Sequence, residues 1–270
     1  MQPCLLMLGS LLVLSPVASG DGMETELKLR SSAETGDLRA MRELAVSLLA
    51  TAESDAREAV YWLEEAAAAG DTESLHQLAS MRFAGARTYC DHRQAVTLWK
   101  AAAVMGHPDA MYDLAVCYRD GRGTARSQIR SSIWFKRAAE FARPEAMTAW
   151  GRCLFDGIGV MRDEELAVRW WTKAARKGDV AAMVALAAAS ATGRGMERDQ
   201  AVSAHWWRKA ANRGCPVAML VTAANYEVGM GVEADPVKAD AWYARVRNGV
   251  DVAAPTVGLV LALPPDFAAR

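Results

Sequence analysis

The chain has 270 residues, with 31 basic and 32 acidic side chains and a formal net charge of −1. This balance gives no field strong enough to attract nucleic acid or anionic lipid, so neither is an expected partner. Alanine and other helix-forming residues dominate, and no long β-branched run is present. The composition therefore favours an all-α protein.

The first 20 residues differ from the rest of the chain. An apolar run from Cys4 to Leu14 is followed by a proline and small residues. The run is too short to span a bilayer and predicts a secretory signal peptide over residues 1–20, cleaved near Ser19 or Gly20. No positive side chain precedes it, so a buried amphipathic segment or a start at Met23 remains an alternative. We expect export to the periplasm or beyond, with no membrane span in the mature chain.

From about residue 33 to residue 250 the sequence repeats with a period of 36 residues. Two adjacent columns of this repeat collect eight of the nine tryptophans. The inner column contains Leu63, Trp99, Phe135, Trp171, Trp207 and Tyr243, and the outer column contains Trp62, Leu98, Trp134, Trp170, Trp206 and Trp242. A fixed period in the thirties is typical of solenoids built from supersecondary units.

Each unit has the pattern helix, loop, helix. In the third unit DAMYDLAVCY has helical spacing, RDGRGT interrupts it, and SSIWFKRAAEFA forms a second helix. The GxG loops follow helices rather than strands, so we interpret them as turns and not as phosphate cradles. A recurring aspartate before the second helix, absent at Ser127, fits an N-cap. The pattern predicts six helical pairs, at about residues 36–70, 70–106, 106–142, 142–178, 178–214 and 214–249.

The paired tryptophans are explained by the same repeat. Adjacent helical residues point about 100° apart, so two neighbouring rings cannot enter one interface. We expect one ring to be buried against the partner helix of its own unit and the other against the neighbouring unit. This structural role is favoured over an aromatic ligand site.

The unit A-M-Y-D-L-A-V-C-Y-R-D-G-R-G, followed by A-V-x-W-W, K-A-A and a closing glycine, resembles the Sel1-like repeat, which is related to the tetratricopeptide repeat. The resemblance covers about residues 36–249. It implies an all-α, right-handed α/α superhelical solenoid of about six helix-loop-helix repeats, whose first helices line a concave surface that binds other proteins. The proline-rich tail, residues 251–270, is expected to cap the last repeat.

The resemblance also suggests classes of function. Many bacterial members are exported, and they include periplasmic regulators of sensors and immunity partners of secreted toxins. A disulfide-rich subgroup has been linked to penicillin binding and β-lactamase activity, but it bridges each repeat with a cysteine pair, which this chain lacks. Cys117 and Cys153 occupy the same place in neighbouring units, where helices 8–10 Å apart disfavour a disulfide, so we expect free, buried thiols.

The sequence shows no catalytic or metal-binding motif. It has no CxxC pair, and its four histidines lie far apart in the sequence. Adjacent glutamates such as Glu164 and Glu165 fit a solvated helix face better than acid–base catalysis. We therefore predict no catalytic residue, no metal site and no cofactor.

The candidate partner site lies on the first helices. The outward position of each first helix is predicted to be Arg42, His76, Tyr112, Thr148, Val184 and Leu220. Because aromatic residues and arginine often anchor interfaces, the candidate partner-binding residues are Arg42, His76, Tyr112, Arg152 and Phe155. The alternative is that these are ordinary solvent-facing or inter-helix residues.

These observations predict a scaffold or adaptor of the cell envelope that binds another protein and is not an enzyme. One alternative is a hydrolase of cell-wall or β-lactam substrates. Another is a cytoplasmic scaffold, if translation starts at Met23.

Overall fold

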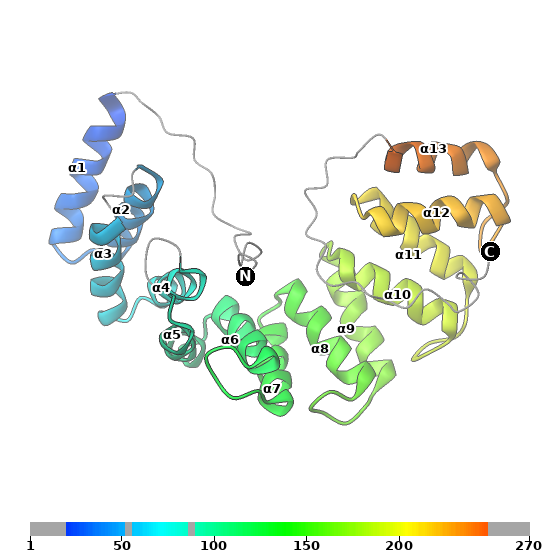
Figure 1. Ribbon diagram of the computed structural model, residues 1–270, viewed down its shortest axis with the longest axis horizontal. Helices are drawn as coiled ribbons and strands as arrows, with labels where there is room; N and C mark the ends of the chain where they lie inside the picture. The colour runs from blue at the N-terminus through cyan, green and yellow to red at the C-terminus, as the bar shows by residue number, and fades with distance from the viewer. Residues whose placement is uncertain (1–19, 52–55, 86–89, 248–270) are drawn as a thin grey trace. The chain divides into compact units, whose positions relative to one another are not determined.

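The computed structural model describes residues 20–51, 56–85 and 90–247 (Figure 1). Apart from its last residue, the predicted signal peptide lies outside the described residues, as does the predicted capping tail, 251–270. The described residues form thirteen helices and contain no strand, so the protein is an all-α repeat solenoid as predicted. None of these helices is long and apolar enough to cross a membrane.

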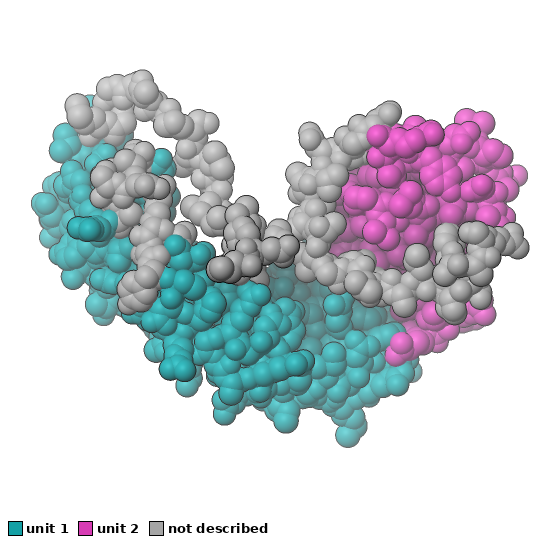
Figure 2. Space-filling view, in the orientation of Figure 1, with its two compact units in different colours: residues 1–179 teal, residues 180–270 magenta. Residues whose placement is uncertain are grey.

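The chain divides into two compact units, residues 1–179 and 180–270, which Figure 2 colours separately. The helices of the first unit are α1 Gly20–Glu34, α2 Leu38–Thr51, α3 Ala56–Ala68, α4 Thr72–Ala84, α5 His92–Val104, α6 Pro108–Asp120, α7 Gln128–Glu140, α8 Pro144–Asp156 and α9 Glu164–Arg176. Those of the second unit are α10 Val180–Thr192, α11 Gln200–Asn212, α12 Pro216–Val228 and α13 Pro236–Arg247. From α2 onward the helices form six pairs, which we number repeats 1 to 6.

Helix α1 was not predicted. Its sequence, GDGMETELKLRSSAE, is largely polar and does not follow the repeat pattern. It is held by tertiary contacts with α2 and α3. Ala33 is buried in the core of repeat 1, and the Arg30 guanidinium donates to the Glu58 carboxylate at 3.0 Å. The fold thus includes one helix before the first repeat.

Local capping explains where the helices begin and end. The carboxylates of Asp91, Asp163 and Asp199 accept hydrogen bonds from backbone amides of the helices that follow them. Ser127 stands where the other repeats have aspartate and accepts a hydrogen bond from the Arg130 amide, so the N-cap is preserved. Ala142, which replaces the closing glycine of repeat 3, is the one described non-glycine residue with a positive φ, at 63°.

The second glycine of the GxG loop is required by close contact between repeats. A Cβ atom at Gly123 would lie 2.1 Å from the His92 carbonyl oxygen, at the start of α5 in the preceding repeat. The corresponding distance from Gly159 to the Gln128 carbonyl oxygen is 2.2 Å. Backbone approaches this close admit only glycine. The loops are therefore packing surfaces, which supports their interpretation as turns.

In repeats 2 to 4 the inner ring is buried against the first helix of its own repeat, as predicted for one ring of each pair, whereas Trp207 of repeat 5 is only half-buried. Trp99 and Trp171 are each 4 % exposed, and their rings lie 5.0 and 4.9 Å from those of Phe83 and Phe155. In repeat 3, Phe135 contacts Tyr112 in the same way, at 5.5 Å.

The outer column is less buried than predicted. Trp134 and Trp170 are only half-buried, and a cation three residues later covers each ring: Arg137 at 4.7 Å and Lys173 at 4.5 Å from the ring centroids. An amphipathic side chain over an indole face shields it from water while keeping the charge solvated. The prediction that the second ring of each pair is buried against the neighbouring unit is therefore wrong for this column in repeats 3 and 4.

Candidate functional site

The outward positions predicted on the first helices form what we call the first-helix row: Arg42, His76, Tyr112, Thr148, Val184 and Leu220. In the first unit each member of this row contacts the residue directly before the first helix of the next repeat. We call these partners the cap row: Asp71, His107, Arg143 and Asp179. Row and cap residues lie 29 to 31 positions apart in the sequence.

The four contacts use different chemistry at equivalent places. The Arg42 guanidinium forms an ion pair with the Asp71 carboxylate at 2.9 Å. The rings of His76 and His107 stack with centroids 4.8 Å apart and 20° between their planes. The Arg143 guanidinium lies 4.3 Å from the Tyr112 ring centroid, and Thr148 Oγ1 donates to Asp179 Oδ1 at 2.8 Å.

Three of the five predicted partner-binding residues, Arg42, His76 and Tyr112, therefore join repeats to one another. Phe155 is half-buried and its ring packs on Trp171 within repeat 4. Arg152 is exposed on α8. Of the five, Arg152 is the residue whose side chain is most open to solvent, and the binding role of all five stays a prediction.

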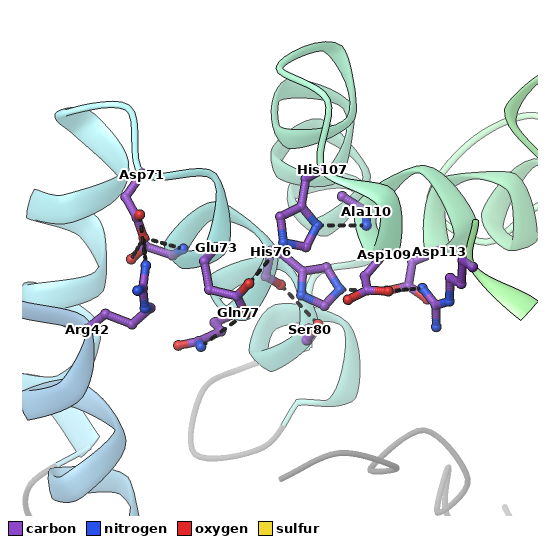
Figure 3. Close-up of polar contacts among 12 residues, drawn as sticks. Arg42, Asp71, Glu73, His76, Gln77, Ser80, His107, Asp109, Ala110 and Asp113 are labelled. Carbon is purple, nitrogen blue, oxygen red and sulfur yellow. Dashed lines mark hydrogen bonds and ion pairs between the residues drawn. The ribbon is translucent and has the colours of Figure 1, made fainter. Parts of the chain in front are cut away.

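A polar cluster surrounds the stacked histidines where α4 meets α6 (Figure 3). His107 Nε2 donates to Glu73 Oε2 at 3.0 Å, and His76 Nε2 donates to Asp113 Oδ2 at 2.8 Å. Because an ionised carboxylate only accepts, each ring carries its proton on Nε2. Gln77 Nε2 donates to the other oxygen of Glu73 at 3.3 Å.

His107 also caps helix α6. Its Nδ1 accepts the Ala110 amide at 3.2 Å, as the Asp71 carboxylate accepts the Ser74 amide at the start of α4. A protonated Nδ1 could not accept this bond, so the cap requires a neutral ring. The hydrogen bond from His107 holds the pKa of the Glu73 carboxyl down to about 2, against the opposing effect of burial. Glu73 is therefore ionised at neutral pH.

Glu73, His76 and His107 each offer a ligand atom, and these three atoms lie within 4.8 Å of one another. The sequence placed the histidines in different repeats, far apart in the sequence, but the structure brings the His76 and His107 rings into contact. They are 31 residues apart, nearly one repeat, and stacking of repeats brings positions at that separation together. The repeat period predicts this pairing only when one already knows that the first-helix row contacts the cap row of the next repeat.

The first-helix row has a different character in the second unit. Val184 is fully buried and Leu220 is 45 % exposed. Helix α12 also exposes Val217 and Val228, at 39 % and 72 %, and with Leu220 they follow one another at roughly helical spacing. This helix therefore presents an apolar row to solvent.

A shallow polar pocket in the second unit is lined by Arg208, Tyr226, Val232, Glu233, Ala234, Asp235 and Lys238. Its two cations face two carboxylates, and Lys238 Nζ pairs with Asp235 Oδ2 at 2.8 Å. The balanced charge gives the pocket no preference for an anion or a cation.

Solved structures of similar fold come from several bacteria. A protective antigen of uropathogenic Escherichia coli strains, described as displaying an SLR fold, is 31 % identical with a TM-score of 0.78, and the match covers 83 % of this chain and 48 % of that one. A Sel1 repeat protein from Oxalobacter formigenes is 24 % identical with a TM-score of 0.70, covering 83 % and 98 %. An immunity protein from Pseudomonas aeruginosa is 20 % identical with a TM-score of 0.50, covering 85 % and 89 %.

This chain thus spans about half the length of the Escherichia coli protein that it resembles. No curated protein matches its sequence. The family model for the Sel1 repeat matches residues 38–71, 72–107, 108–140, 144–179, 180–215 and 216–245, which together make up most of the chain. The chain belongs to the Sel1 repeat family.

Proposed function

We propose that the protein is an adaptor of the cell envelope that binds a partner protein through the exposed part of its first helices. Sel1 repeats generally serve as scaffolds for protein–protein interaction and are typically not enzymes. The apolar amino-terminal segment supports an exported location. The description of the similar Escherichia coli protein as a protective antigen supports it further.

The observation that carries the proposal is the apolar row of α12. Val217, Leu220 and Val228 lie at the solvent surface of a helix whose other face is buried. Exposed apolar residues grouped on one helix face are typical of interaction sites. The partner expected here presents an apolar segment, such as one face of an amphipathic helix.

The test is affinity capture from the native cell with the tagged full-length chain. Leu220→Asp places a charge in the row and is expected to abolish capture of the specific partner. Val237→Asp, at a residue 79 % exposed on the second helix of the same repeat, is the matched control and should retain it. Equal capture by both variants, with unchanged helical circular dichroism, would contradict the assignment of the α12 row.

Arg152 provides a second probe, in the first unit. Arg152→Glu reverses an exposed charge on α8 and should weaken capture of the partner without unfolding the chain. Glu145→Lys, also on α8 at a side chain 55 % exposed, is the control for a nonspecific charge effect. Unchanged capture by the Arg152 variant would remove this residue from the site.

Export is tested separately by mass spectrometry of the mature protein. We expect an amino terminus near residue 20, left by removal of the apolar segment. A protein that still begins at Met1 or Met23 would rule out the proposed location but not the proposed binding role.

A further inference from the structure

We propose that Glu73, His76 and His107 bind one divalent transition-metal ion at the junction of repeats 2 and 3. Their ligand atoms lie within 4.8 Å of one another, and they come from α4 and from the residue that caps α6. Two imidazoles and a carboxylate are a donor set that suits Zn²⁺, Co²⁺ or Ni²⁺. The proposal is independent of partner binding by α8 or α12.

The surroundings of the three side chains resemble the outer sphere of a metal site. Asp113 accepts from His76 Nε2 at 2.8 Å, and this leaves Nδ1 of the same ring unprotonated and able to bind a cation. A carboxylate that orients a ligating histidine in this way is characteristic of metal sites. Gln77 holds the Glu73 carboxylate from its other oxygen.

The charge of the cluster also favours a dication. Glu73 and Asp113 contribute two negative charges, while the cap geometry keeps His107 neutral. The nearby Asp109 carboxylate is already paired with Arg143 at 2.6 Å. Its negative charge is therefore compensated and does not add to those of Glu73 and Asp113. A divalent cation between the rings would neutralise the two carboxylates.

Binding requires two defined changes. The proton between His107 Nε2 and Glu73 Oε2 must move to His107 Nδ1, and the Ala110 amide then loses its acceptor. The lone pairs lie in the ring planes, and the planes are only 20° apart, so one ring must turn before both can reach one ion. Binding breaks both hydrogen bonds of His107 but leaves the one from His76 Nε2 to Asp113 in place, which makes His107 the ring expected to turn.

The direct test is isothermal titration of the full-length chain, freed of metal by chelation, with Zn²⁺. We expect one ion per chain. His107→Asn removes a ligand but keeps an amide oxygen that can cap α6, so its loss of binding would not reflect an unfolded helix. Asp113→Asn, which removes the carboxylate that orients His76 together with one negative charge, should weaken binding by about 10- to 100-fold. His107→Asn should weaken it more.

The matched control is the double variant His92→Asn/His205→Asn, which removes the two histidines outside the cluster. It should bind Zn²⁺ as the unmodified chain does. Absence of stoichiometric binding, or equal loss in the control, would overturn the proposal. Amide exchange gives a second readout: Zn²⁺ should speed exchange at Ala110, and unchanged exchange would overturn the assignment of His107 Nε2 as a ligand.

Discussion

Repeats 2 and 4 contain the same aromatic pair in nearly the same geometry. Phe83 and Trp99 in repeat 2 meet at 49°, and Phe155 and Trp171 in repeat 4 meet at 44°. Yet Trp171 Nε1 donates to the Thr148 carbonyl oxygen at 3.1 Å, while the buried Nε1 of Trp99 has no partner among the described residues. Equivalent tryptophans thus differ in whether the indole N–H has a hydrogen-bond acceptor.

The residue beneath the ring differs between the two repeats. Repeat 4 has Gly151 beneath the indole, and a Cβ atom there would lie 2.4 Å from Trp171 Nε1. Repeat 2 has Ala79 at the equivalent position. Repeat 3 avoids the conflict by combining Ala115 with Phe135, whose ring carries no N–H. Gly151 thus leaves room for the Trp171 indole close to the helix backbone, whereas alanine at the same position accompanies Trp99 in repeat 2 and Phe135 in repeat 3.

The largest effect is expected from Trp171→Ala, which empties the centre of repeat 4. It should lower the free energy of unfolding by about 3–5 kcal/mol, because it removes a large buried ring and its hydrogen bond. Trp170→Ala, at the half-buried neighbour covered by Lys173, should cost only about 1 kcal/mol. Urea denaturation followed by circular dichroism measures both values. Equal losses would contradict the different roles of the two columns.

Gly151→Ala should destabilise by about 1–3 kcal/mol, although alanine is the better helix former. The new methyl group collides with the indole and breaks the hydrogen bond to Thr148. The control is Gly151→Ala in a Trp171→Phe background, which reproduces the pair of repeat 3. There the same change should be neutral or stabilising, and a persistent loss would show that the indole is not the cause.

Thr148→Val tests the contacts between the first-helix row and the cap row. The expected loss in the free energy of unfolding is smaller, about 1 kcal/mol. The variant retains the side-chain volume and removes the hydrogen bond to Asp179. Thr172→Val is matched to it within repeat 4, because the Thr172 hydroxyl donates only to the Val168 carbonyl of its own helix. The difference between the two variants in urea denaturation isolates the contact between repeats, and no difference would mean that it contributes nothing.

The smallest effect on stability concerns the thiols. Burial raises the pKa of Cys153 in repeat 4 to about 11 and that of Cys117 to about 12, whereas Cys90 before α5 is exposed. In the native chain at pH 8, a disulfide reagent such as Ellman's should modify Cys90 rapidly and leave the two buried thiols unreacted. Rapid modification of Cys153 would contradict its burial.

The raised pKa values also set the direction of a pH dependence. The folded chain retains these two protons above pH 9, where unfolded thiols lose theirs, so the free energy of unfolding should fall as the pH rises from about 9 toward 11. Cys117→Ala/Cys153→Ala should flatten this part of the stability profile.

Much of the fold was predictable because its causes are local or periodic. The caps at Asp91 and Asp163, the positive φ of Gly121 and Gly157, and the inner aromatic column follow from residue types at fixed spacing. Helix α1 was not predictable in this way, because its polar sequence carries no period and its packing against α2 and α3 stabilises it.

The site was predictable only in part. The count along the first helices selected one equivalent position in each repeat, including Arg42, His76 and Tyr112. It could not tell that these side chains face the next repeat, because that depends on how far each repeat is displaced and rotated against its neighbour. For the same reason the sequence did not predict that the His76 ring stacks on the His107 ring.

The sequence alone determined the helical repeat, the closing turns and the family, because these depend on spacing within one unit of 36 residues. The tertiary structure decided which polar side chains pair across repeats and which buried indole N–H has a hydrogen-bond acceptor. Those outcomes depend on distances of a few ångströms between helices that the chain brings together only when it stacks.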